Sequence, residues 1–344
     1  MSPEDRRRSH WPSRRDVVGL GIGAFLVAVT PGWLRRPRAV VRRSVPVMGT
    51  IAELAVVHRQ PRYAHAAIAA AVEALRRVDR TMTRFAATSD VGRANLTALR
   101  SPVPVSVETA YVLREALRWA EASAGAFDPC LARAVELWNV GGRSAPPSPE
   151  QVQAWKGRRL YRALELAPRD DAATVRFHHA SAGIDLGGIA KGYAVDRAAD
   201  ALRAYGVSDA LLGVGGDLVA LGRSEDGDPW QVGIRSPDHP DRIAETIEVT
   251  DRAVATSGDY FQYFTHHGRR YHHLLDPATG EPRRSAVRSV TVVAETCLAA
   301  DAGATAVFGL ERPAAERILR VCAPHAHVVS TIAEPERLDE ILTG

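Results

Sequence analysis

The segment best suited to chemistry joins an acid, two glycines and a lysine at the expected start of a helix. Asp185 is followed by Gly187, Gly188 and Lys191, and small or apolar residues then recur with helical spacing. Glycines at a helix N-terminus let a phosphate approach free backbone N–H groups, and a lysine in the first turn adds positive charge. As a bare pattern the segment is more typical of a tight turn before a helix, because it has neither a Walker A nor a Rossmann fingerprint.

A second candidate site lies on a helix expected over residues 298–310. Asp301 and Thr305 are four residues apart, so their oxygens project from one helix face. A carboxylate and a hydroxyl, completed by backbone carbonyls and phosphate oxygens, suit a hard cation such as Mg²⁺. An Asp–Thr pair at this spacing is more often a solvated face, but the alanines on both sides of Asp301 favour a buried site.

Three further polar clusters occur at residues 213–217, 255–260 and 273–280. The first is Gly-Val-Gly-Gly-Asp, which suits either a sharp bend or the close approach of a flat ligand. Its spacing alone favours the bend.

These clusters need strands and helices to bring them together, and apolar periodicity predicts both. Residues 48–57 are rich in β-formers, and apolar residues recur at helical spacing over residues 63–80. Further strands are expected near residues 174–178, 210–221, 229–235, 245–250, 270–275 and 288–294, and further helices over 108–122, 189–205, 298–310, 313–321 and 334–342. Residues 141–150 are a proline-rich surface loop. The pattern predicts an α+β fold, a mainly antiparallel sheet covered by helices in one large catalytic domain.

Composition fits a globular protein with a large core, because 46% of the 344 residues are hydrophobic and 24% are charged. The net charge of +4 arises in the first 43 residues, which hold ten arginines and three acids. The remaining charges nearly balance, so nothing favours a nucleic-acid surface. The three cysteines are far apart and form no CxxC pair, which argues against a thiolate zinc site.

Residues 1–43 are predicted to be a leader, and residues 44–344 the catalytic domain. Arg14 and Arg15 precede an apolar run over residues 17–29, which is shorter than the roughly 20 residues of a membrane-spanning helix. A twin-arginine signal is the favoured interpretation, and an uncleaved anchor helix stays open as the alternative. Either interpretation predicts an exported protein, periplasmic or on the outer face of the cytoplasmic membrane.

Eight short segments of the chain occur in an order that matches a known family. They are Met48-Gly-Thr50, Ser89-Asp90 with Arg93-Ala-Asn95, Gly125-Ala-Phe-Asp-Pro129, Asp185-Leu-Gly-Gly-Ile-Ala-Lys-Gly192, Gly215-Gly-Asp217, Thr256-Ser-Gly-Asp-Tyr260, His273-Leu-Leu-Asp-Pro277 and Ala300-Asp-Ala-Gly-Ala-Thr305. Together they resemble the FAD:protein FMN transferase family, also called the ApbE family, from about residue 45 to residue 310.

The resemblance implies a set of site residues. Those placed where the family contacts FAD are Met48, Phe85, Ala126, Phe127, Asp128, Asp185, Lys191 and Leu275. Those placed where it holds Mg²⁺ are Asp301, Thr305 and the carbonyl of Gly188. His273 and Asp301 are the implied catalytic residues, with His273 a candidate base. Two departures occur: Phe85 stands where the family often has tyrosine, and positions 274–275 are Leu-Leu where it has Ile-Ile.

The implied activity is Mg²⁺-dependent transfer of FMN from FAD to a threonine or serine of an acceptor protein, with release of AMP. The family implies an acceptor that is a flavin-carrying subunit of a membrane redox complex. One alternative is an FAD pyrophosphatase, in which water replaces the acceptor hydroxyl. Another is a non-catalytic FAD-binding protein outside the cytoplasm. An oxidoreductase is less favoured, because no substrate motif accompanies the flavin residues.

Overall fold

Residues 39–169, 172–239 and 241–333 are described by a computed structural model of the chain. Their largest element is a seven-stranded sheet in which every neighbouring pair of strands is antiparallel. In spatial order its strands are β1 (Val40–Val47), β2 (Thr50–Val57), β6 (Asp209–Val214), β7 (Asp217–Leu221), β10 (Arg252–Gly258), β15 (Val287–Ala294) and β16 (His327–Ala333).

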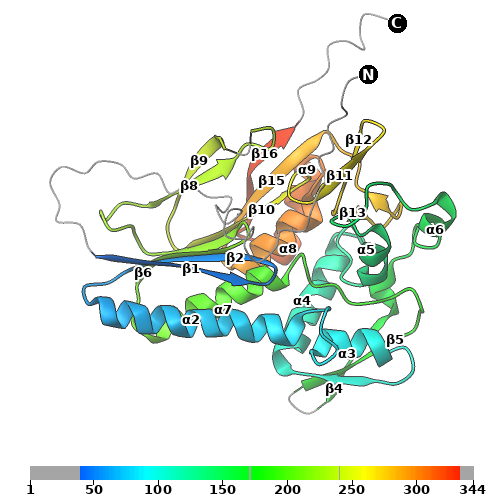
Figure 1. Ribbon diagram of the computed structural model, residues 1–344, viewed down its shortest axis with the longest axis horizontal. Coiled ribbons are helices and arrows are strands. Elements are labelled where there is room, and N and C mark those ends of the chain that lie inside the picture. The colour runs from blue at the N-terminus through cyan, green and yellow to red at the C-terminus, as the bar shows by residue number, and fades with distance from the viewer. Residues whose placement is uncertain (1–38, 170–171, 240, 334–344) are drawn as a thin grey trace, which may run out of the picture.

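Helices cover one face of this sheet, and a two-stranded ribbon covers part of the other (Figure 1). The helices are α2 (Pro61–Met82), α7 (Ala190–Ala204) and α8 (Cys297–Val307), whose apolar faces build the main core. The ribbon of β8 (Trp230–Arg235) and β9 (Ile243–Val249) encloses a smaller core on the opposite face.

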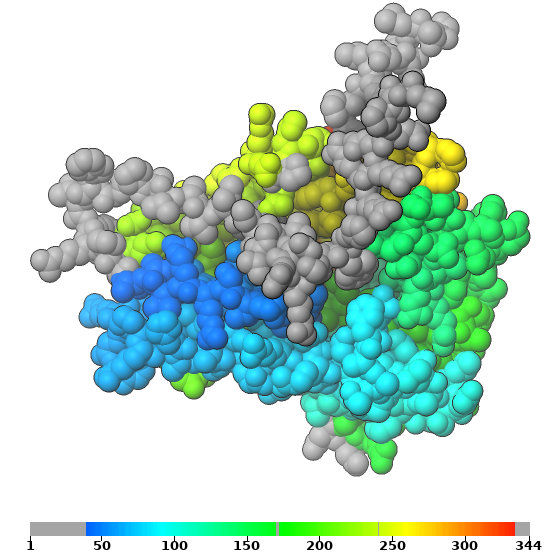
Figure 2. Space-filling model, in the orientation of Figure 1, coloured from blue at the N-terminus to red at the C-terminus, as the bar shows by residue number. Residues whose placement is uncertain are grey.

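The middle of the chain forms a second lobe beside the sheet (Figure 2). Its elements are α3 (Asp90–Thr97), β3 (Val103–Val105), α4 (Val107–Ala122), α5 (Ala132–Trp138), α6 (Pro149–Gln153), η1 (Leu160–Ala163), β4 (Leu164–Arg169) and β5 (Ala172–Phe177). The remaining elements are β11 (Tyr263–His266), β12 (Arg269–His272), β13 (Leu275–Asp276), β14 (Glu281–Pro282) and α9 (Arg312–Cys322). One continuous apolar core joins the two lobes, so they form a single domain.

Helices α2 and α8 differ in sequence character. Helix α2 begins with Pro61 in its first turn and buries one stripe that includes Ile68, Val72 and Leu75. Helix α8 is buried on almost every side, and Asp301 is its one charged residue. A buried charge needs partners, so its surroundings are the first place to look for function.

Two tight hairpins turn through glycines at the same end of the sheet. Met48 and Gly49 both have positive φ, at 52° and 72°, and join β1 to β2. Gly215 and Gly216, at 60° and 112°, join β6 to β7. Two-residue hairpin turns require such backbone angles, which explains the glycines at 49, 215 and 216 without a ligand.

The α+β fold with an antiparallel sheet is confirmed, and most predicted elements are present. The strand predicted over 48–57 begins after the turn, and the run over 210–221 is a hairpin of two strands. β1 begins at Val40, inside the predicted leader. The strand was not predicted there, because its arginines, which are common on edge strands, obscured the apolar pattern of a strand. The rest of the predicted leader, its arginine pair included, and the helix predicted over 334–342 lie outside the described residues. Within the described ranges, no helix has both the length and the apolar character needed to cross a bilayer.

Candidate active site

Lys191 joins α7 to two acidic residues that are far apart in the sequence. Its Nζ donates hydrogen bonds to Asp217, the first residue of β7, and to Oδ1 of Asp301 in α8 at 3.3 Å. Both carboxylates are only 3% exposed. The fold therefore brings three of the matched segments to one buried point.

Two carboxylates share one lysine, so this cluster carries more negative than positive charge. Burial raises the pKa of Asp217 to about 7, and repulsion from Asp301 adds to the effect while Lys191 opposes it. Burial disfavours the charged form of Lys191, but attraction to both carboxylates outweighs it and raises the pKa of the lysine. Lys191 therefore stays charged, and an added cation would relieve the repulsion between the two acids.

The first turn of α7 packs directly on α8. The N–H of Gly192 donates to Oδ2 of Asp301 at 3.0 Å. A Cβ atom at position 192 would lie 2.2 Å from the carbonyl oxygen of Cys297, so only glycine permits this approach. Asp301 is thus fixed from two sides, and its oxygens keep lone pairs for a further partner.

Of the residues predicted to hold Mg²⁺, Gly188 and Thr305 are neighbours, and Asp301 lies four residues before Thr305 on α8. A Cβ at Gly188 would lie 3.0 Å from Oγ1 of Thr305 and 3.3 Å from the ring of Phe127, so these three residues are neighbours. Ser257 adds a hydroxyl, with its Oγ 3.3 Å from Thr305 Oγ1. Carboxylate, hydroxyl and carbonyl oxygens are the ligands that Mg²⁺ prefers, so the residues present fit this ion.

This arrangement differs from a metal site built from side chains alone. In the part of the chain that the structure describes, no three His, Cys, Asp or Glu side chains gather around one point as such a site requires. The predicted ligand set contains a single carboxylate, so phosphate oxygens and water would complete it.

The segment Ala126 to Asp128 is shaped by the end of α4. Gly125 has φ of 90°, and the N–H of Phe127 donates to the side chain of Ser123 at 2.9 Å. Asp128 accepts backbone N–H groups of Cys130 at 2.8 Å and Tyr161 at 3.1 Å, and burial raises its pKa to about 6. Its carboxylate therefore holds the loop that presents Phe127 to Gly188.

Arg84 contacts both Asp185 and Phe85. The Nε of Arg84 is 3.1 Å from Oδ2 of Asp185, and its guanidinium lies 4.3 Å from the ring centroid of Phe85. Phe85 is 79% exposed and lines a pocket of about 260 Å³ together with Arg84 and Asn95. A large aromatic ring held open to solvent is well placed to stack on a flat ligand.

Met48 lies in the β1–β2 turn and packs against the main core. Its N–H donates to Oδ2 of Asp79 in α2 at 3.2 Å. The side chain is partly buried, and the turn is fixed to the helix beneath it.

The two adjacent histidines have different environments. His272 is buried, its Nδ1 accepts the N–H of Leu274 at 3.2 Å, and its Nε2 donates to the carbonyl of Arg283 at 2.9 Å. His273 is partly buried, and its Nδ1 lies 3.4 Å from the carbonyl of Gln262. Burial and then the neighbouring His272 lower the pKa of His273 to about 4. A carbonyl only accepts, so His273 carries its proton on Nδ1 and leaves Nε2 as a free base.

Leu275 lies away from Phe127. It is buried with Trp138, Phe264 and Tyr271 in a separate small core, whereas Leu274 packs against the main one. The structure does not bring Leu275 together with the other residues predicted to contact FAD, although it lies two residues from His273.

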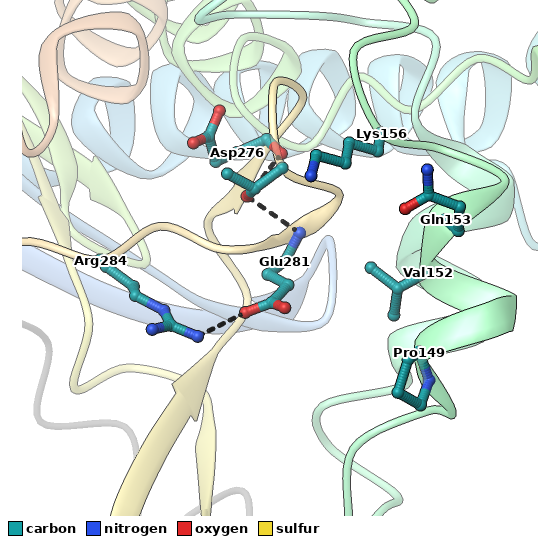
Figure 3. Close-up of a pocket in the computed structure, with 8 residues that line it drawn as sticks. Pro149, Val152, Gln153, Lys156, Asp276, Glu281 and Arg284 are labelled. Carbon is teal, nitrogen blue, oxygen red and sulfur yellow. Dashed lines mark hydrogen bonds and ion pairs between the residues drawn. The ribbon is translucent and has the colours of Figure 1, made fainter.

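A second pocket, of about 540 Å³, lies between α6 and the β13–β14 hairpin (Figure 3). Asp276 lines it, and Figure 3 shows Arg284 paired with Glu281 on one side and Lys156 pointing toward the hairpin. The Oδ1 of Asp276 accepts the N–H of Ala278 at 2.9 Å, so this carboxylate closes the turn after His273.

Sequence reasoning gave no role to two residues that hold the site in place. Asn95 bonds both backbone groups of Ile184, at 2.8 and 2.6 Å, and so fixes the segment leading to Asp185. Asp196 of α7 accepts the N–H groups of Cys297 and Leu298, at 2.8 and 2.9 Å, and caps α8. An acid on the alanine-rich face of a predicted helix was the available signal for Asp196.

Comparison with known proteins identifies the family of the chain. Residues 48–329 match the sequence model of the ApbE family. FAD:protein FMN transferases of Vibrio cholerae and Treponema pallidum are 34% and 35% identical to the chain, covering 80% and 78% of it and 84% and 78% of the relatives.

Solved structures give the same result. The flavin transferase ApbE from Vibrio cholerae superposes with a TM-score of 0.75 at 30% identity, covering 87% of this chain and 95% of the other. The ApbE protein of Thermotoga maritima has a TM-score of 0.71 at 32% identity, covering 82% of this chain and 88% of the other. Sequence and fold agree, and the chain belongs to the ApbE family of flavin transferases.

Proposed function

We propose that this chain transfers FMN from FAD to a threonine or serine hydroxyl of an acceptor protein, with Mg²⁺ bound and AMP released. The observation that carries the proposal is the convergence of Lys191, Asp217 and Asp301 beside the contact of Gly188 with Thr305 and Phe127. A flavin pyrophosphate suits this site, because the site offers a lysine cation and oxygen ligands for a hard metal ion beside an aromatic ring.

The reaction exchanges one P–O bond for another. The acceptor oxygen bonds to the FMN-side phosphorus, the bond from this phosphorus to the bridging oxygen breaks, and AMP leaves with that oxygen. Mg²⁺ held by Asp301, Thr305 and the Gly188 carbonyl would neutralise charge on the pyrophosphate. Lys191, fixed by two carboxylates, adds a permanent positive charge at the same point.

His273 is the proposed base that takes the hydroxyl proton. Its low pKa keeps the ring neutral at pH 7, and its Nε2 is the nitrogen left free to accept a proton. His272 is not an alternative, because backbone groups occupy both of its ring nitrogens.

Transfer and hydrolysis differ only in the nucleophile, so one experiment separates them. The protein is incubated with FAD and Mg²⁺ with and without an acceptor, and AMP is measured by chromatography. Transfer predicts that AMP forms rapidly only with the acceptor present. Rapid and complete AMP release without an acceptor would identify an FAD pyrophosphatase. FAD binding without any AMP release would indicate a flavin-binding protein.

We further propose that the chain is exported and acts on a flavin-carrying subunit of a membrane redox complex. The support is the Arg14–Arg15 pair before an apolar run and the family's protein acceptors. Replacing both arginines by lysine should retain the precursor in the cytoplasm, as measured by fractionation. Unchanged export would mean that the pair belongs to an ordinary basic segment.

A further inference from the structure

Arg283 connects three segments of the candidate site. It follows β14, and its Nη2 donates to the carbonyl of Ala126 at 2.7 Å while its Nη1 donates to the carbonyl of Phe308. Its own N–H donates to the carbonyl of Leu274 at 2.9 Å, and its carbonyl accepts Nε2 of His272 at 2.9 Å. One residue therefore touches the 126–128 loop, the end of α8 and the turn that carries His273.

This arginine is held without a carboxylate partner. Among the described residues, its guanidinium donates to two carbonyls, and no ion pair joins it to an acid. Burial lowers the pKa of Arg283, against a weaker effect of Asp276. Arg283 is partly buried, and withdrawing an unpaired cation from water is unfavourable, so packing alone would favour an apolar side chain here.

The two carbonyls explain how the charge is tolerated. Phe308 follows the last turn of α8, where unpaired carbonyls give the helix a partial negative charge that stabilises a cation. The planar guanidinium holds two donors at fixed separation, so it sets the distance between Ala126 and Phe308 as a lysine cannot.

We propose that Arg283 is a positioning residue for FMN transfer. Its guanidinium fixes the 126–128 loop against the end of the helix that carries Asp301 and Thr305. Its backbone groups, which every substitution keeps, hold His272 and the turn that carries His273. The inference rests on the proposed function, because it assigns a role within that reaction.

The test compares Arg283→Met and Arg283→Lys with the neighbouring control Arg284→Met. Arg284 is exposed and pairs with Glu281 at the pocket of Figure 3, so its loss removes one charge without touching the three segments. Two quantities are measured at a temperature where each variant is folded: FAD affinity by fluorescence titration, and the single-turnover transfer rate at saturating FAD.

Both Arg283 variants should bind FAD more weakly and transfer FMN about 10²-fold more slowly at saturating FAD, since a displacement near 1 Å can cost that much. Arg283→Lys keeps the charge but should stay impaired, and ethylguanidinium added to Arg283→Ala should restore part of the rate. The Arg284→Met protein should match the wild type in both quantities.

The proposal is overturned if Arg283→Met or Arg283→Lys keeps wild-type affinity and rate, even with a lower unfolding temperature. That result would make Arg283 a stabilising residue only. If Arg283→Met does not fold, Arg283→Lys decides the question on its own. If the wild type binds FAD but never transfers FMN, the proposed function fails, and the FAD affinities still test Arg283.

Discussion

The N–H of Gly192, in the first turn of α7, donates a hydrogen bond of 3.0 Å to Oδ2 of Asp301 in α8. This contact joins the phosphate-binding pattern read from one part of the sequence to the cation site read from another. It requires a glycine, because the carbonyl of Cys297 leaves no room for a side chain.

Gly192→Ala should therefore destabilise the protein by about 1–3 kcal/mol or more, the usual range for overpacking a core. Its Cβ would meet backbone, which cannot rotate away. Gly303→Ala in α8 is the matched control, because its Cβ would meet the flexible end of Leu319 at 2.9 Å. Urea unfolding measures both, and equal losses for the two variants would contradict the proposed α7–α8 contact.

Asp301→Asn should leave the protein folded and abolish transfer. It removes the only charged ligand in the predicted Mg²⁺ set, and metal stabilisation of phosphoryl transfer is worth several kcal/mol, or about 10²-fold or more in rate. Calorimetry should show no heat of Mg²⁺ binding in the presence of FAD, and EDTA should inactivate the wild type. Asp200→Asn, on the exposed face of α7, is the control. Full activity of Asp301→Asn would contradict the proposal that Asp301 holds a Mg²⁺ ion required for transfer.

Stability should depend on pH through Asp196. Burial raises its pKa to about 6, although the N–H groups of Leu298 and Cys297 lower it. A carboxyl with a raised folded pKa binds protons more tightly when folded, so its stabilising contribution is complete below about pH 4 and is lost as pH rises to about 6. The loss across this window is about 3 kcal/mol.

The measurement is the free energy of unfolding of the wild type and Asp196→Asn between pH 4 and 7. The variant should be less stable at every pH, because an amide replaces a cap, but its stability should fall less over that window. Asp128 and Asp217, whose pKa values are raised to about 6 and about 7, contribute to the slope that remains. Parallel curves for the two proteins would contradict the role of Asp196.

His273→Ala should bind FAD nearly as well as the wild type and transfer FMN about 10²–10⁴-fold more slowly, as is typical on loss of a general base. In the wild type, the single-turnover rate should fall as pH drops through about 4, because protonation removes the base. The control His272→Ala should lower stability through its lost backbone contacts. Weakened FAD binding with an unchanged rate would mean that His273 contacts FAD and is not the base.

The sequence predicted the elements whose apolar periodicity is strong, such as α2, α7 and β15. The family resemblance implied that Gly188, Asp301 and Thr305 hold Mg²⁺. In the structure, Gly188 lies against Thr305, and Asp301 lies four residues before Thr305 on α8. Periodicity could not resolve β10, because its Thr-Ser-Gly segment reads as a polar cluster, although the strand is central in the sheet.

Contacts between distant segments could not be predicted from the sequence. The pairing of Lys191 with Asp217 joins residues 26 positions apart, and that of Arg283 with Ala126 joins residues 157 apart. No local spacing encodes such pairs, because they depend on the sheet order. Leu274 and Leu275 likewise pack against different cores, because consecutive side chains of an extended segment point to opposite sides.

The most direct test of the proposed function is the intact mass of an acceptor. A flavin-carrying subunit of a membrane redox complex, purified without its flavin, is incubated with the protein, FAD and Mg²⁺, and its mass is measured over time. The account predicts a gain equal to the mass of FAD less that of AMP, which is one FMN less one water. The gain should lie on a threonine or serine located by peptide mapping, with one AMP released for each acceptor modified and no gain with Asp301→Asn. An unmodified acceptor, while FAD is converted to free FMN and AMP, would contradict it.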